Sequence, residues 1–591
     1  MENGQKKLKE LFDGRKVFNI PDYQRAYAWD KTRQLPDFLE DIENQSLGRD
    51  YFLGTILFQE RDEKMQGYDV IDVVDGQQRI TTIIIFMKAL LDELADRLGA
   101  IEFEDKGLDL VTETYIKSRN RSKLQAISPD NDFFQKYILE NQDGTDYITT
   151  PSQRRLYSAK RFFADALTKK STDDLLDLKT KLDSNTKVLT YSVKDTAEAT
   201  LIFETTNDRG KGLTNLEKIK SFLMYKTYLC TGENVDVHLR SIQERFTEIY
   251  RELEQFDDKL SEDSALQYHC IAFERWTDKA DYQQPVNFIK AKINPLINSN
   301  KKDDALTFID RFSKELKESF TILRLLMQSQ SEGFRDLVCL DRLGTFYPLL
   351  LKAFKLDSTP TKANFDLTCK FLEIYSFRVF SIQQSRSNTG QPALFGAARD
   401  FGGKFTPLYD KITNLISNHS PNKLFKEHLQ YTDFYNYMHS RDTSYLYWKY
   451  ENYLRRMEQP ICANMSEQEY RDASRRTGLT IEHIAAQNPE ELGIVRDASI
   501  LPSLTQEFLE DHINRLGNLT FDPASANASK GNGNIKVKNS DYFKKAPYKT
   551  QNELDTFIIN GKWGVKSIDA REKKIIKFCV QRWNPEYLEL S

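Results

Sequence analysis

A change of sequence pattern near residue 230 is the feature that most constrains the fold of this 591-residue chain. Before it, segments rich in β-branched and aromatic residues alternate with helical patterns, and residues 51–59 and 68–74 flank a polar turn in the manner of a β-hairpin. After it come long amphipathic helical stretches. A chain of this length exceeds what one hydrophobic core can serve. We therefore predict an α+β protein with three domains: a mixed α/β domain at 1–229, an all-helical domain at 230–460, and a last domain at 461–591.

The periodicities also predict individual elements within these domains. A strand is expected at residues 188–193, where apolar β-formers follow one another. Apolar positions recur at helical spacing in several segments, each long enough to bury one face. Helices are therefore expected at residues 79–97, 197–203, 215–228, 238–256, 305–327 and 365–380.

Composition excludes several classes of protein. No stretch of about 18 uncharged apolar residues is present, so a membrane span is not expected, and the N-terminal residues lack the apolar core of a secretory signal, which makes the cytoplasm the expected location. The six cysteines stand singly, without the Cys-x-x-Cys spacing of a zinc or redox site, and are expected to be reduced. The net charge of -4 indicates that any contact with DNA is local.

One histidine with a carboxylate beside it marks a candidate nuclease centre in the last domain. His483 is the natural general base, because a neutral imidazole can take a proton from water attacking phosphorus. Glu482 and Asn532 are the expected ligands of Mg²⁺ or another divalent cation. Asn518 and Asn527 are expected to orient the histidine or to fix the loop, and Asn527 can exchange roles with Asn532. Side chains alternate along a strand, so Glu482 and His483 point to opposite sides unless the strand is bulged or ends there.

A lysine-rich segment follows this centre. Residues 530–549 contain six lysines and one aspartate, a local net charge of +5, which indicates a strip facing DNA phosphates, although a solvated lysine face has the same composition. His512 is a second candidate histidine, and its spacing favours a structural role. The DNA-binding candidates are Lys530, Lys536, Lys538, Lys544 and Lys545.

The N-terminal domain carries its own polar constellation at residues 75–79 (Asp-Gly-Gln-Gln-Arg), where a strand ends and a helix begins. Backbone N–H groups at a helix start favour an anion, and Arg79 adds a forked pair of donors for a phosphate. Such a junction alone is most often structural. Residues 20–29 pack aromatics around an arginine and a glutamine, and residues 203–214 form a Gly-rich entry to a helix, both of which also have purely structural readings.

Together these three segments resemble the N-terminal domain of GmrSD-type and SspE-type bacterial defence proteins. The resemblance implies a fold similar to ParB and sulfiredoxin and a site that binds and hydrolyses a nucleoside triphosphate, with GTP, UTP and ATP not distinguished. No Gly-x-x-x-x-Gly-Lys-Ser/Thr segment is present, so an ordinary P-loop is not expected. The implied nucleotide-binding residues are Asp75, Gly76, Gln77, Gln78 and Arg79, with Arg25 and Asn207 in support.

The C-terminal residues resemble the HNH domain of the same family, which implies a ββα-metal fold. Residues 482–487 read Glu-His-Ile-Ala-Ala-Gln, with Ala486 where the family usually has proline, and residues 516–520 read Leu-Gly-Asn-Leu-Thr. Two spaced asparagines follow, as in the family. The family's closing pattern is matched by Trp563, Ile568, Arg571 and Trp583.

The resemblance implies a nucleotide-regulated, metal-dependent DNA endonuclease or nickase of anti-phage defence, with NTPase activity in the N-terminal domain. Its expected partners are double-stranded DNA, in particular modified phage DNA as in type IV restriction, and a nucleoside triphosphate; a homodimer is left open. One alternative is a nucleotide-gated sensor of DNA modification with a vestigial HNH centre, suggested by Ala486 and the Gly-rich loop at 530–534. Another is a ParB-like clamp without hydrolysis.

Overall fold

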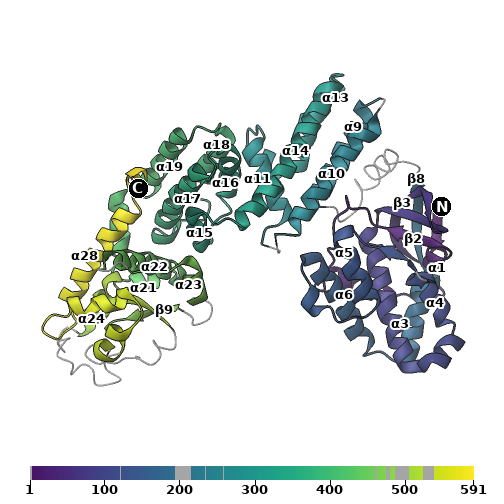
Figure 1. Ribbon diagram of the computed structural model, residues 1–591, viewed down its shortest axis with the longest axis horizontal. Coiled ribbons are helices and arrows are strands. Elements are labelled where there is room, and N and C mark those ends of the chain that lie inside the picture. Colours follow the sequence, from purple (N-terminus) through teal and green to yellow (C-terminus); the bar gives the residue numbers. More distant parts are fainter. Residues whose placement is uncertain are drawn as a thin grey trace. The chain divides into compact units, whose positions relative to one another are not determined.

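The computed structural model describes residues 3–119, 121–193, 214–232, 234–256, 259–458, 462–473, 479–485, 505–523 and 538–590. The chain divides into two compact units, which Figure 1 follows in colour along the sequence. The first comprises Met1–Cys270 and Trp276–Met327, and the second comprises Ile271–Arg275 and Gln328–Ser591. Neither expected domain boundary, after 229 or after 460, coincides with this division, because the predicted helical domain contributes residues to both units.

A six-stranded mixed sheet forms the centre of the first unit, with the strand order β1-β8-β3-β4-β2-β7. Strands β3 and β4 are antiparallel and joined at Gln66 and Gly67, which both have positive φ, so the predicted hairpin is confirmed. The predicted strand at 188–193 is confirmed as β8, which lies parallel to β3. The strands are β1 (Gly4–Lys7), β2 (Lys16–Asn19), β3 (Tyr51–Met65), β4 (Tyr68–Asp75), β7 (Leu124–Gln125) and β8 (Thr186–Val193).

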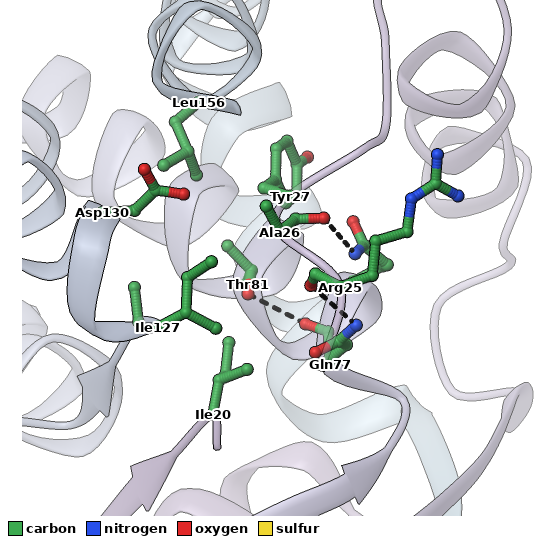
Figure 2. A pocket seen from close by; sticks show the side chains of 11 residues that line it. Ile20, Arg25, Ala26, Tyr27, Gln77, Thr81, Ile127, Asp130 and Leu156 are labelled. Carbon is green, nitrogen blue, oxygen red and sulfur yellow. Dashed lines mark hydrogen bonds between the residues drawn. The ribbon is translucent and has the colours of Figure 1, made fainter. Parts of the chain in front are cut away.

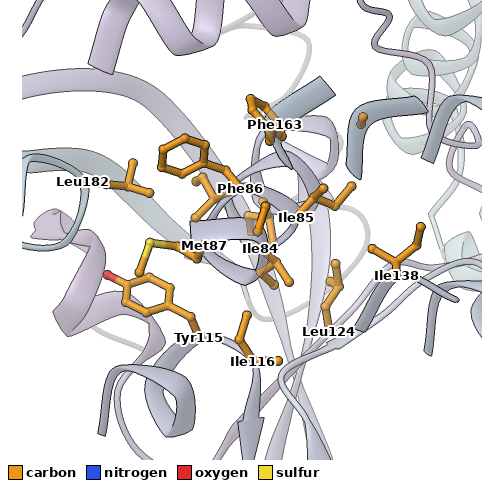
Figure 3. Packing of buried hydrophobic residues seen from close by; sticks show 14 of the residues in the cluster. Ile84, Ile85, Phe86, Met87, Tyr115, Ile116, Leu124, Ile138, Phe163 and Leu182 are labelled. Carbon is orange, nitrogen blue, oxygen red and sulfur yellow. The ribbon is translucent and has the colours of Figure 1, made fainter. Parts of the chain in front are cut away.

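Helix α3 (Gln77–Asp105) is the central core helix of this unit and confirms the helix predicted at 79–97. Its first half is buried nearly all round, and Phe86 meets Phe163 of α6 (Pro151–Leu167) with ring centroids 5.2 Å apart (Figure 3). The helix begins directly after Gly76, whose φ is 88°. A Cβ at Gly76 would lie 3.1 Å from a side-chain carbon of Ile56, so both the backbone conformation and the packing select glycine.

Further helices complete the first unit, and three of them confirm predicted ones. Helices α9, α10 and α14 correspond to the patterns at 215–228, 238–256 and 305–327, and α14 packs on both α9 and α10 (Figure 1). The helix predicted at 197–203 lies outside the described residues. The helices are α1 (Leu8–Phe12), α2 (Gln34–Glu43), α4 (Leu108–Tyr115), α5 (Ser128–Phe133), α7 (Thr172–Thr180), α9 (Asn215–Cys230), α10 (Val235–Leu253), α11 (Glu262–Phe273, which ends in the second unit), α12 (Lys279–Gln283), α13 (Pro285–Asn298) and α14 (Lys302–Met327).

The second unit begins with helices that pack on one another around α17 (Ala363–Tyr375). The pattern at 365–380 predicts one helix, but α17 ends at Tyr375 and a wider π-helical turn, Ser376–Ile382, continues the buried segment. The other helices are α15 (Glu332–Cys339), α16 (Tyr347–Leu356), α18 (Gln391–Asp400), α19 (Phe405–His419), α20 (Asn422–Leu429), α21 (Phe434–Tyr437), α22 (Ser440–Met457), α23 (Glu467–Asp472), α24 (Thr505–Asp511), α27 (Lys549–Asn552) and α28 (Val565–Arg582).

A two-stranded antiparallel sheet lies in the C-terminal part of this unit. It pairs β9 (Leu479–His483) with β10 (Leu519–Pro523), and α22 contacts both strands. These strands match the first two elements of the expected ββα arrangement, and the residues that follow β10 directly, 524–537, lie outside the described part. The chain is thus an α+β protein whose middle is helical, as predicted. Within the described ranges, no helix has the length and apolar character needed to cross a membrane.

Candidate functional site

His483 is the last residue of β9 and stands opposite Leu519 of β10. Its side chain is buried, and its Nε2 lies 3.1 Å from Oδ1 of Asn514. The ring of Tyr435 meets the imidazole at 63°, with centroids 4.4 Å apart. Burial lowers the pKa of His483 to about 4, and the nearby ammonium of Lys538 acts in the same direction, while the contact with Asn514 opposes it. The imidazole is therefore neutral near pH 7, which is the form that accepts a proton.

Asn514 is held in place by Asp433, which directly precedes α21, and by Tyr435, which lies within it. Nδ2 of Asn514 donates to Oδ1 of Asp433 at 2.8 Å, and the backbone N–H of Tyr435 donates to the backbone oxygen of Asn514 at 2.9 Å. The sequence did not identify Asn514, Asp433 or Tyr435 as parts of the site. Their separation from His483 along the chain follows no motif, and only the tertiary fold brings them together.

Glu482 and His483 reach different partners, in agreement with the alternation expected along a strand. Glu482 is 3 % exposed, and its Oε1 lies 2.6 Å from Nζ of Lys538. The same ammonium donates to the backbone oxygen of His483 at 2.9 Å. Lys538 is 1 % exposed, so its assignment to a strip facing DNA phosphates is wrong. Its charge is held inside the unit by Glu482, because a desolvated ammonium needs a paired anion.

The described residues around His483 do not by themselves make a complete site for a divalent cation. The lysine ammonium occupies the carboxylate that was expected to be a ligand. Over the described ranges, no group of three or more His, Cys, Asp or Glu side chains is arranged to hold a metal ion. Asn532, the second expected ligand, and Asn527 both lie outside the described residues.

Asn518 fixes the loop between the two strands rather than the imidazole. Its side-chain oxygen accepts from the backbone N–H of Ala485 and from Nε1 of Trp563, both at 3.0 Å, and its Nδ2 donates to the backbone oxygen of Ile513 at 2.8 Å. The side chain is fully buried. Of the two roles expected for Asn518, the described contacts match loop fixation. They also give Trp563, a residue of the closing pattern, a direct structural role.

Arg571 secures the same loop from α28. Its guanidinium donates to the backbone oxygens of Gly517 at 3.0 Å and Leu519 at 2.5 Å, and its Nε lies 3.1 Å from Oε1 of Glu553. Gly517 packs closely on the same helix, since a Cβ there would lie 2.3 Å from the backbone oxygen of Ile568. The start of β10 is therefore held by contacts to its backbone that tolerate little displacement.

The remaining C-terminal candidates are placed as follows. His512 lies 3.1 Å, through Nδ1, from the guanidinium of Arg515, which agrees with the structural role that its spacing favours. Lys544 and Lys545 are exposed, and Lys544 is 3.0 Å from Asp555. Exposure leaves both lysines reachable by a polyanion. The two others proposed for the DNA strip, Lys530 and Lys536, lie outside the described residues.

The two glutamines of the N-terminal segment 75–79 fasten the neighbouring segment 25–28 to the start of α3. Nε2 of Gln77 donates to the backbone oxygen of Arg25 at 3.0 Å. Gln78 uses both ends of its amide, accepting from the N–H of Ala28 at 2.9 Å and donating to the oxygen of Ala26 at 3.2 Å. The buried Oε1 of Gln77 has no hydrogen-bond partner among the described residues. The structure thus brings Arg25 and the predicted nucleotide segment together.

Charged groups surround the same turn. Arg79 donates through Nη1 to the backbone oxygen of Thr55 at 2.8 Å. Burial raises the pKa of Asp75, and the charge of Arg79 opposes that shift. Lys220 of α9 is buried beside them, donates to the oxygen of Tyr23 at 3.0 Å, and has its pKa lowered to about 8 by burial. Sequence reasoning missed Lys220, although a lysine inside the apolar run of α9 was a usable signal.

A small pocket opens beside this turn, and Figure 2 shows the side chains that line it. Its space is about 280 Å³, a figure that includes the part open to solvent. Arg25 points its guanidinium away from Asp130 and Ile127 (Figure 2), and its Nη1 lies 3.5 Å from Oε1 of Glu262 on α11. The pocket therefore joins apolar walls to motif side chains. Asn207, expected to support the site, lies outside the described residues.

Two family models match the chain. The model of the N-terminal domain of the GmrSD restriction endonuclease matches residues 8–224, and the model of the C-terminal domain of GmrSD restriction endonucleases matches residues 420–578. Together they cover more than half of the chain and include both candidate sites. No curated protein matches the chain.

Proposed function

The chain belongs to the family of GmrSD restriction endonucleases and is a DNA endonuclease of the restriction type, and from this premise we propose that a nucleotide controls its cleavage of modified DNA. In this proposal the centre at His483 cuts or nicks the DNA with a divalent cation such as Mg²⁺. The segment 75–79 binds and hydrolyses a nucleoside triphosphate. The target is double-stranded DNA that carries a modification, as phage genomes do, and the setting is antiviral defence in the cytoplasm.

The observation that carries the nuclease half is the environment of His483. A buried, neutral imidazole at the end of a strand, whose Nε2 is hydrogen-bonded to Asn514, is prepared to take a proton from a water molecule. A pKa of about 4 makes the ring a weak base while no substrate is bound. A DNA phosphate beside the ring would raise that pKa towards neutrality, because a nearby negative charge favours the imidazolium. Base strength would then increase only when the substrate is in place.

The test uses the purified full-length protein with modified and unmodified phage DNA, with and without Mg²⁺, and examines both strands. We expect cleavage that needs the cation, is stopped by a chelator, and is lost in His483→Ala. His512→Ala is the matched control, because that histidine contacts Arg515 outside the proposed centre; it should cleave as the wild type does. Cleavage by His483→Ala at the wild-type rate would refute the proposed base.

The nucleotide half rests on the cations around the start of α3. Arg25, Arg79 and Lys220 lie at or beside a helix N-terminus, where backbone N–H groups and the helix dipole favour phosphate. Phosphate release measured with GTP, UTP and ATP in turn identifies the nucleotide, and DNA cleavage assayed with each shows whether it activates or restrains the nuclease. We expect Arg25→Ala to lose phosphate release while keeping its thermal unfolding profile. Unchanged hydrolysis in Arg25→Ala would leave the segment as a structural clamp.

The ion pair between Lys538 and Glu482 favours a second candidate function, a nucleotide-gated sensor of DNA modification with a vestigial centre. A carboxylate that already holds an ammonium is poorly placed to ligate a metal ion. In that case the protein binds modified DNA in a nucleotide-dependent manner but leaves a supercoiled plasmid that carries the modification intact. Mg²⁺-dependent nicking of that plasmid by the wild type, absent in His483→Ala, would exclude the sensor.

A further inference from the structure

We propose that Asp433 and Asn514 form a relay that fixes the tautomer of His483, so that Nε2 carries the proton and Nδ1 is the atom that acts as the base. This inference rests on the proposed role of His483 as the general base. Neither residue belongs to the segments from which that role was derived. Both are positioning residues, because they act through the imidazole.

The direction of each hydrogen bond follows from what each group is able to donate. An ionised carboxylate only accepts, so the Asn514 atom that faces Oδ1 of Asp433 at 2.8 Å must be the amide nitrogen. The amide oxygen of Asn514 is then the atom 3.1 Å from Nε2 of His483. An amide oxygen also only accepts, and Nε2 must therefore donate its proton to it. A neutral imidazole has one N–H, which leaves the lone pair on Nδ1.

Packing holds the relay in this arrangement. The backbone N–H of Tyr435 donates to the oxygen of Asn514, and the Tyr435 ring contacts the imidazole edge-on. Oδ1 of Asp433 also accepts from Nδ2 of Asn436 at 2.8 Å. One short segment at α21 contains Asp433, Tyr435 and Asn436. This segment therefore contacts both Asn514 and the imidazole ring of His483. Rotation of the Asn514 amide would place its oxygen against the carboxylate, which the charge opposes.

The decisive measurement is the tautomer of His483 in the full-length protein. Protein labelled with ¹⁵N-histidine gives long-range ¹H–¹⁵N correlations whose pattern separates the Nε2–H form, the Nδ1–H form and the imidazolium. The chain has seven histidines, and the set of signals lost in His483→Ala identifies this one. We expect the Nε2–H form in the wild type. In Asp433→Asn the second amide is able to donate as well as accept, so both tautomers should appear. An Nδ1–H form in the wild type would overturn the relay.

Cleavage kinetics give an independent readout. We expect Asn514→Ala to lower kcat on modified DNA by about 10- to 100-fold, the range usual for residues that orient an active group, with KM for DNA unchanged. Asn422→Ala is the matched control, since Asn422 is an exposed asparagine at the start of α20 and is not part of the relay, and its kcat should stay within about twofold of the wild type. Wild-type kcat in a folded Asn514→Ala would overturn the relay. If Asn514→Ala unfolds, Asp433→Asn takes its place in the same comparison.

The two experiments separate failure of the relay from failure of the proposed function. Cleavage that persists in His483→Ala would show that His483 is not the base, and the comparison of kcat values would then no longer test the relay. The tautomer spectrum of the wild type would still report whether the relay exists. Loss of cleavage in His483→Ala together with an Nδ1–H imidazole in the wild type would leave the nuclease assignment intact and reject the relay alone.

Discussion

Replacing Lys538 by methionine tests what the buried ion pair beside the candidate centre does. Both side chains are almost fully buried, and Nζ of Lys538 lies 2.6 Å from Oε1 of Glu482. Removing one partner of such a pair leaves the other charge buried without its counter-ion, which costs about 3 to 5 kcal/mol. Removing both charges, in Lys538→Met combined with Glu482→Gln, avoids that cost, and the double variant should recover most of the lost stability.

Thermal unfolding measures the difference. In a unit of this size each kcal/mol corresponds to roughly 2 °C, so Lys538→Met should lower the transition of the second unit by about 6 to 10 °C. The double variant should melt within a few degrees of the wild type. A single variant as stable as the wild type, or a double variant no more stable than the single one, would refute the argument from buried charge.

The melting temperatures of the same variants in the presence of Mg²⁺ test whether Glu482 is a metal ligand. Once Lys538 is removed, its ammonium no longer competes for the carboxylate of Glu482, and a cation that binds the folded state stabilises it in proportion to the logarithm of its concentration. We expect Mg²⁺ to raise the melting temperature of Lys538→Met and to leave the double variant unchanged. Equal responses in both variants would show that Glu482 is not a ligand.

Three further predictions concern other residues. Gly517→Ala should destabilise the second unit by about 1 to 3 kcal/mol, because the added Cβ meets the backbone of α28; Gly396→Ala in α18, where a Cβ meets nothing within 4 Å, is the control in denaturant titrations. The pKa of Lys220 is lowered from 10.5 to about 8 in the folded chain, so between pH 8 and pH 10.5 the unfolded chain binds more protons than the folded chain. The free energy of unfolding of the first unit should therefore rise by up to about 3 kcal/mol through this group as the pH rises from 8 to 10.5. Unfolding curves of Lys220→Met should lack this rise. Glu262→Gln should tighten nucleotide binding about twofold to fivefold in a fluorescence titration, because Arg25 loses a competing carboxylate.

The elements that the sequence predicted well are those with strong local signals. Helix α3 and the β3–β4 hairpin follow from periodicity and turn chemistry within a few residues of the chain. The pattern at 365–380 predicts one helix, because an apolar face does not distinguish an α-turn from the wider turn that starts at Ser376. Local signals thus specify the type of a secondary-structure element better than the residue at which it ends.

Long-range partners were beyond the reach of the sequence. His483 was identified by its motif, but Asn514 and Asp433, which hold it, were not, because their contacts depend on how α21 packs. Composition predicts a surface charge at Lys538, since it does not distinguish a solvated lysine from one that is buried against Glu482. The sequence therefore predicted the residue at the centre of the candidate site and missed the residues that surround it.

The amides of the two motifs serve chiefly to build the sites, and this decides which substitutions are informative. Gln78 and Asn518 each donate and accept through one side chain, and their partners are the backbone of a neighbouring segment or, for Asn518, the indole of Trp563 as well. Loss of activity in Gln78→Ala or Asn518→Ala would therefore report a displaced backbone as readily as lost chemistry. Asn514 differs, because its amide contacts the imidazole of the proposed base, His483, itself. A change there alters the proton on His483 while the strands stay in place, so kcat and the tautomer should change together.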